Sequence, residues 1–122
     1  MTIATVQIDF EITDTDFVDI LETAAMCIGY WADDCEIAEP YDSTDSETEM
    51  ALTCEEGTQL YSLRKFDIQD AMGSIANGLI TIDPSIKGDI LSAIKNDDYG
   101  YIDGYAADAI IQVACFGEVI YG

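Results

Sequence analysis

The sequence of 122 residues contains no histidine and few basic residues: four Lys and Arg stand against 25 Asp and Glu. Without histidine, neither a Ser-His nor a Cys-His nucleophilic pair can form, and no glycine-rich loop followed by lysine is present to hold a phosphate. Carboxylates are so numerous that no pair of them points to general acid-base catalysis. We therefore expect a protein that is not an enzyme and that uses no cofactor.

The shortage of positive charge also limits the partners. The formal net charge is -21 and the isoelectric point is about 4.1. Direct binding to DNA, RNA or an anionic membrane needs a basic face, so we expect none of these as partners. No apolar run reaches the roughly 18 residues of a membrane span, and the N-terminus lacks the basic segment of a signal peptide. These absences predict a soluble protein of the cytoplasm.

The four cysteines, Cys27, Cys35, Cys54 and Cys115, form no C-x-x-C pair. No histidine is available to complete a zinc site. We expect buried thiols and no metal site.

The apolar content is sufficient for a folded core. Hydrophobic residues make up 49% of the chain and the mean hydropathy is +0.12. Acidic disordered tails lack the apolar residues that offset chain entropy, so the carboxylates are expected on a folded protein. The length suits a single domain that spans residues 1–122.

The first half of the chain predicts strands and one helix. Alternation of apolar and polar residues over 6–12 is typical of a half-buried strand. Thr13 and Asp16 have the spacing of a capping box and precede an apolar stripe, which predicts a helix that ends at Gly29. A second strand is predicted over 30–37.

A hairpin is predicted from 47–54 and 58–63, with its turn between them. The second half then shows helical periodicity. We expect a helix with Asp67 as its N-cap and Gly78 as its stop.

The last third predicts two more helices. Asp83 and Pro84 form a typical N-cap and N1 pair. A further helix is predicted over 105–115 with Gly117 at its end, and residues 119–121 are expected to return to the sheet. The pattern predicts an α+β fold in which a small antiparallel sheet packs against about four helices.

Residues 96–103 have some likeness to the centre of an EF-hand loop. With Gly100 at loop position six, however, Lys95, Tyr99 and Ala106 fall where carboxylate ligands are needed. A structural turn is the better interpretation, and a weak calcium-binding module stays an alternative.

The negative charge is concentrated in the first half of the chain. Residues 1–63 hold 16 acids and no Lys or Arg, and ten acids lie within 33–56. Alternate residues on a strand lie roughly 6.6 to 6.8 Å apart and helix neighbours about 5 to 6 Å apart, spacings that suit an imitation of DNA phosphates. A solvated or halophilic surface is the competing explanation; a halophilic domain would need molar salt to fold.

Size, acidity and a folded core together resemble the small acidic DNA-mimic inhibitors of phages and mobile elements, the anti-CRISPR and anti-restriction class. The C-terminal segment DGYAADAIIQVACFGEVIYG, from Asp103 to Gly122, is similar to the ending of short phage and plasmid proteins. Members of the mimic class differ in fold. The resemblance implies a protein that occupies the DNA-binding groove of a Cas effector or restriction enzyme inside a host cell.

We therefore hypothesise an inhibitor with an acidic face that binds a basic nucleic-acid-binding protein. The acidic face comprises Asp9, Glu11, Asp16, Asp19, Glu22, Asp33, Asp34, Glu36, Glu47, Glu49, Glu55 and Glu56. Tyr30, Trp31 and Tyr41 lie among these acids and are candidate aromatic anchors, with core packing the stronger interpretation for Trp31. The alternatives are a halophilic acidic interaction or housekeeping domain and a weak calcium-binding module.

Overall fold

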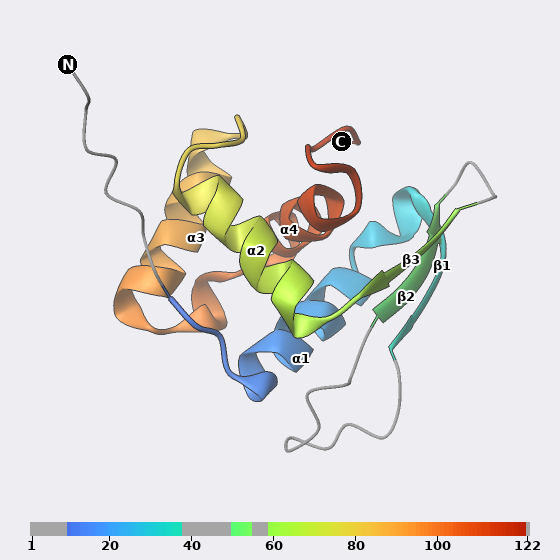
Figure 1. Ribbon diagram of the computed structural model, residues 1–122, viewed down its shortest axis with the longest axis horizontal. Helices are drawn as coiled ribbons and strands as arrows, with labels where there is room; N and C mark the ends of the chain where they lie inside the picture. Colours follow the sequence, from blue (N-terminus) through green and yellow to red (C-terminus); the bar gives the residue numbers. More distant parts are fainter. Residues whose placement is uncertain (1–9, 38–49, 55–58, 122) are drawn as a thin grey trace.

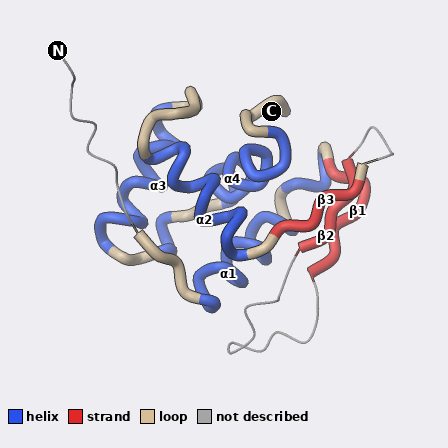
Figure 2. The backbone as a smooth tube through the Cα atoms, viewed as in Figure 1, coloured by secondary structure: helices blue, strands red, loops and turns tan. Residues whose placement is uncertain are grey.

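The structure is a computed structural model that describes residues 10–37, 50–54 and 59–121, and for 51–54 it describes the backbone alone (Figure 1). The elements in these residues are α1 (Asp14–Ala25), η1 (Ile28–Tyr30), β1 (Ala32–Ile37), β2 (Met50–Cys54), β3 (Leu60–Leu63), α2 (Lys65–Ala76), α3 (Pro84–Asn96), η2 (Tyr99–Tyr101) and α4 (Gly104–Phe116). The helices gather on one side and the strands on the other (Figure 2). The predicted α+β class, with a small sheet and four helices, is confirmed for the described residues.

The sheet is antiparallel with strand order β1-β2-β3. Met50 pairs with Ile37 on one side and with Leu63 on the other, which fixes the register. A bulge lies between Ala32 and Asp34. The strand predicted over 30–37 is confirmed from Ala32 to Ile37, but it begins two residues later than predicted, because Tyr30 belongs to η1 and Trp31 ends that turn. The predicted hairpin is confirmed where it is described, while residues 47–49 and 55–58 lie outside the described residues.

The strand predicted over 6–12 is wrong in its described part, because Phe10 to Ile12 have no regular structure. Gln69 on α2 binds this segment instead. Its Oε1 accepts a hydrogen bond from the Ile12 N–H at 3.1 Å, and its Nε2 donates to the Phe10 carbonyl at 3.1 Å. One side-chain amide thus satisfies the backbone groups that a neighbouring strand would otherwise bind, and Ile12 is still buried.

The return of residues 119–121 to the sheet is also wrong. Oε1 of Gln112 accepts hydrogen bonds from the N–H groups of Ile120 and Tyr121, at 2.9 and 2.8 Å. Its Nε2 donates to the Tyr121 carbonyl at 3.2 Å. The C-terminal tail therefore packs against α4 as irregular backbone.

Local signals place most helix ends. Thr13 and Asp16 form the predicted capping box of α1, each backbone N–H donating to the other side chain at 3.1 Å. The helix ends at Ala25, earlier than predicted, because the 3-10 turn η1 follows and contains Gly29. The Gly78 backbone, with φ at +74°, follows the end of α2 as predicted.

The N-cap predicted for α2 is wrong by one turn. Arg64 is the N-cap, and Asp67 occupies the N3 position, where its carboxylate accepts the Arg64 N–H at 2.9 Å. The start of α3 is as predicted, since Asp83 accepts the Ser85 N–H at 2.8 Å and Pro84 follows it. Gly117, with φ at +78°, ends α4 as predicted.

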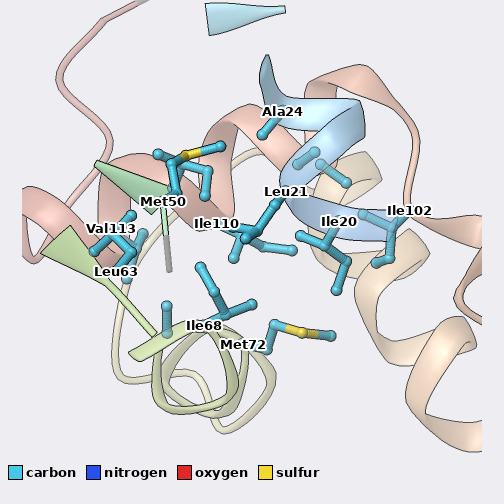
Figure 3. Close-up of a cluster of buried hydrophobic side chains, with 14 of the residues drawn as sticks. Ile20, Leu21, Ala24, Met50, Leu63, Ile68, Met72, Ile102, Ile110 and Val113 are labelled. Carbon is cyan, nitrogen blue, oxygen red and sulfur yellow. The ribbon is translucent and has the colours of Figure 1, made fainter. Parts of the chain in front are cut away.

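The core forms around α4. This helix is alanine-rich and buries residues on most of its circumference, because it contacts α1, α2, α3 and β3. Figure 3 shows Ile110 of α4 beside Leu21 of α1 and above Ile68 of α2. Met50 and Leu63 bring the sheet to the same cluster, so one continuous core holds the sheet against the helices.

Candidate functional site

No Asp or Glu that the structure describes is buried; each is exposed or half-buried. Of the acidic face, the exposed members are Glu11, Asp19, Glu22, Asp33, Asp34 and Glu36. Asp9, Glu47, Glu49, Glu55, Glu56 and Tyr41 lie outside the described residues. Asp16 differs from the exposed group, since it is half-buried and its carboxylate caps α1.

Two adjacent elements present five of these exposed acids. Asp19 and Glu22 lie three residues apart on α1, and Asp33, Asp34 and Glu36 lie on β1. The two elements are joined through η1 and contact one another. We call Asp19, Glu22, Asp33, Asp34 and Glu36 the α1–β1 carboxylates.

The edge position of β1 and its bulge explain how three acids of one strand reach solvent. Asp34 and Glu36 alternate with the half-buried Cys35 and share one side of the strand. The bulge adds Asp33 as an extra residue, so the consecutive side chains of Asp33 and Asp34 are both exposed. Burial and the neighbouring Asp34 charge raise the pKa of the Cys35 thiol.

The described positive charges are Arg64, Lys65, Lys87 and Lys95, and Arg64 directly follows β3. Lys65 forms an ion pair with Asp14, with 2.8 Å between Nζ and Oδ1. Lys87 and Lys95 lie on α3, at the opposite end of the molecule from the sheet (Figure 1). Within the described residues, none of the α1–β1 carboxylates takes part in an ion pair.

Acids outside the acidic face are also exposed, but several of them have a structural use. Asp83 and Asp103 cap α3 and α4, and Asp98 accepts the Gly100 N–H at 3.0 Å within the turn η2. The EF-hand-like segment is thus a capped turn, in agreement with the structural interpretation. Asp70 and Glu118 are exposed on α2 and beyond α4.

Trp31 is not a surface anchor. Its side chain has no exposed area, and its ring stacks on Tyr121 with centroids 5.5 Å apart and an angle of 3° between planes. Phe116 meets it edge-on at 5.5 Å. Trp31 is therefore a core residue and the prediction of a surface anchor is wrong for it. A large apolar ring with one polar N–H packs well in a core where an acceptor is available.

Tyr30 remains available at the surface, with 51% of its area exposed. Its hydroxyl donates a hydrogen bond to Oδ2 of Asp108. Burial of the phenol, followed by the bond and the charge of Asp108, raises the pKa of Tyr30 to about 12.

Asp108 lies on a groove that the sequence did not reveal. The groove has a volume of about 1040 Å³ and is formed by η1, the segment before α3, the first half of α4 and the C-terminal tail. We call it the Asp108 groove. The spacing of Asp108 and Gln112 by one helical turn was the available signal, but the other walls come from distant parts of the chain.

No protein-family model, curated protein or solved structure matches this chain. None of the described helices has the length and apolar character required to cross a bilayer. In residues 10–37, 50–54 and 59–121, no three His, Cys, Asp or Glu side chains converge where they could hold a metal ion.

Proposed function

We propose that this protein is a non-enzymatic inhibitor that imitates nucleic acid. Its α1–β1 carboxylates bind basic side chains in the DNA-binding groove of a Cas effector or restriction enzyme and so exclude the DNA target. Such an inhibitor acts in the cytoplasm of the host cell and belongs with the anti-CRISPR and anti-restriction proteins of phages and mobile elements.

The observation that carries the proposal is the gathering of five exposed acids on two adjacent elements, α1 and β1. The α1–β1 carboxylates have no ion pair within the described residues, whereas Lys65 already neutralises Asp14. Two carboxylates about 6.8 Å apart in water repel by roughly 0.6 kcal/mol before salt screening. A cationic partner would relieve this repulsion and release ions from both surfaces.

The spacing supports the same conclusion. Asp34 and Glu36 are alternate residues of one strand, roughly 6.6 to 6.8 Å apart. Asp19 and Glu22 are helix neighbours, about 5 to 6 Å apart at Cβ. These rows offer anions in series to a groove that ordinarily follows a phosphate backbone.

Charge removal on β1 tests the proposal. The triple variant Asp33→Asn, Asp34→Asn, Glu36→Gln keeps the size of each side chain and removes three charges. The matched control, Asp70→Asn, Asp97→Asn, Glu118→Gln, removes three exposed charges that belong to neither α1 nor β1. Inhibition of DNA cleavage is measured over a panel of purified restriction endonucleases and RNA-guided nucleases.

We expect the β1 variant to lose inhibition of the responding nuclease and the control to retain it. Binding of the β1 variant should also depend less on salt, because the log-log slope falls by about one unit for each ion pair that the substitutions remove. Equal inhibition by both variants would show that general acidity, and not the α1–β1 carboxylates, is responsible.

A further inference from the structure

The Asp108 groove has apolar walls from three parts of the chain. Ile82 precedes α3, Ile86 lies in its first turn, Ala109 faces the groove from α4, and Val119 contributes from the tail. A volume of about 1040 Å³ is at the upper end of the usual range for small-molecule sites, roughly 300 to 1,000 Å³. The walls are therefore suited to the apolar body of a small ligand.

Three carboxylates line the same groove: Asp83, Asp103 and Asp108. Among the described residues that line it, none is basic. Lys87, although it follows Ile86 on α3, is not a lining residue and its Nζ lies beside Gly78. The groove thus combines an apolar surface with uncompensated negative charge.

The hydrogen bonds of these acids hold the carboxylates without cancelling their charge. Asp108 accepts from the hydroxyl of Tyr30, the indole of Trp31 and the amide of Gln112, all of which are neutral donors. Asp83 and Asp103 accept backbone N–H groups at the starts of α3 and α4. Neutral donors fix an anion in position, and its charge remains available to a ligand.

Aromatic rings complete the lining. Tyr30 and Tyr105 both line the groove and are exposed at 51% and 78%. A cation over such a ring is attracted by the ring quadrupole, and an ammonium group gains from this contact as well as from the carboxylates.

We propose that the Asp108 groove binds a small amphiphilic cation, a primary amine or quaternary ammonium compound with an aliphatic or aromatic body. The ammonium group lies near Asp108 and the capping carboxylates, and the body lies against Ile82, Ile86 and Ala109. The site is separate from the α1–β1 carboxylates, so the test of ligand binding does not depend on the proposed inhibition.

Three hexyl probes of different charge and one cation without the hexyl chain test the proposal on the unmodified protein. Hexyltrimethylammonium, hexyl sulfate, hexyl glucoside and tetramethylammonium are titrated by calorimetry, with amide NMR shifts to locate each probe. We expect equimolar binding of hexyltrimethylammonium, about tenfold or more tighter than any other probe, since only it uses both the charge and the apolar walls. The amide shifts should map to Ile82, Ala109 and Val119.

Paired variants separate the groove from the general negative charge. Asp83→Asn with Asp103→Asn removes two groove charges and keeps both helix caps, because Asn is as good an N-cap as Asp. Asp19→Asn with Asp70→Asn removes the same charge outside the groove. The groove pair should weaken hexyltrimethylammonium about fivefold, and the outside pair should change it less than about twofold.

Four results would overturn the proposal. They are absence of binding by hexyltrimethylammonium, equal binding of the neutral and cationic hexyl probes, amide shifts that map away from the groove, and equal weakening by both variant pairs. The NMR and calorimetric arms need no variant and so do not depend on whether the substitutions fold.

Discussion

The indole Nε1 of Trp31 donates a hydrogen bond to Oδ1 of Asp108 at 2.8 Å, although the two residues are 77 positions apart. The bond joins the segment that enters β1 to the middle of α4. Trp31 is fully buried and Asp108 is half-buried, so the bond provides the indole N–H with an acceptor at the boundary of the core. Asp108 therefore both binds a core side chain and lines the groove.

Replacing Asp108 should destabilise the protein. Asp108→Ala leaves the buried indole N–H unpaired, and we expect the free energy of unfolding to fall by about 1–3 kcal/mol. Asp108→Asn keeps one carbonyl acceptor and should lose less. Urea unfolding followed by the emission of Trp31, the chain's one tryptophan, measures both variants. Unchanged stability of Asp108→Ala would contradict this role.

Gln112 should hold the C-terminal tail. Gln112→Leu removes the acceptor of two backbone N–H groups, and we expect faster hydrogen exchange at Ile120 and Tyr121. The free energy of unfolding should fall by about 1–3 kcal/mol. Gln69→Leu is the matched control, because Gln69 binds Phe10 and Ile12 instead and should leave exchange in the tail unchanged.

The close approach of Cys27 to Gly104 gives a third prediction. A Cβ on Gly104 would lie 2.6 Å from the Cys27 Sγ, so Gly104→Ala should cost about 1–3 kcal/mol of stability. Gly88 on α3 has open space beside it, and Gly88→Ala should stabilise by roughly 0.5 to 1 kcal/mol.

A second substitution tests the cause of the Gly104 effect. Cys27→Ala removes the sulfur, so the pair Cys27→Ala with Gly104→Ala should be more stable than the sum of the single effects predicts. Thermal unfolding of the four proteins measures the coupling. Additive effects would show that the sulfur contact is not responsible.

Tyr30 should lose its stabilising effect only in strong alkali. Its pKa is raised from 10.0 to about 12, so the folded state favours the neutral phenol. The contribution to stability is complete below pH 10 and is lost as the pH rises through about 12. The difference in phenolate absorbance between the native protein and Tyr30→Phe, followed against pH, measures this titration. A midpoint near the ordinary value would contradict the burial of the phenol together with its bond to Asp108.

The helix ends that were predicted correctly are those that local interactions determine. Thr13 with Asp16, Asp83 with Pro84, and Gly117 each act within one turn of helix, and all three ends lie where predicted. The hairpin of β2 and β3 also followed from the alternation of its residues on either side of a turn.

The failures involve contacts over long separations. Phe10 to Ile12 alternate like a strand, but the amide of Gln69, which lies 57 residues from Ile12, satisfies their backbone. The tail likewise binds Gln112 instead of a strand. Neither contact leaves a periodic signal in the sequence.

In the candidate site, too, the sequence predicted local features and missed those that join distant segments. Exposure of Asp19 and Glu22 followed from helical spacing, which a single element determines. Exposure of both Asp33 and Asp34 depends on the bulge in the pairing of β1 with β2, which spacing within one strand does not indicate. The Asp108 groove joins residues from η1, α3, α4 and the tail, so no single segment of the sequence could indicate it.

The proposed function requires that this protein and DNA compete for the DNA-binding groove of the nuclease. The most direct measurement is the affinity of a responding nuclease for a labelled DNA duplex at increasing concentrations of this protein. We predict that the apparent Kd for DNA rises linearly with the concentration of this protein while the amplitude of DNA binding is unchanged. A complex that holds both DNA and this protein, or DNA affinity that does not change, would contradict the account.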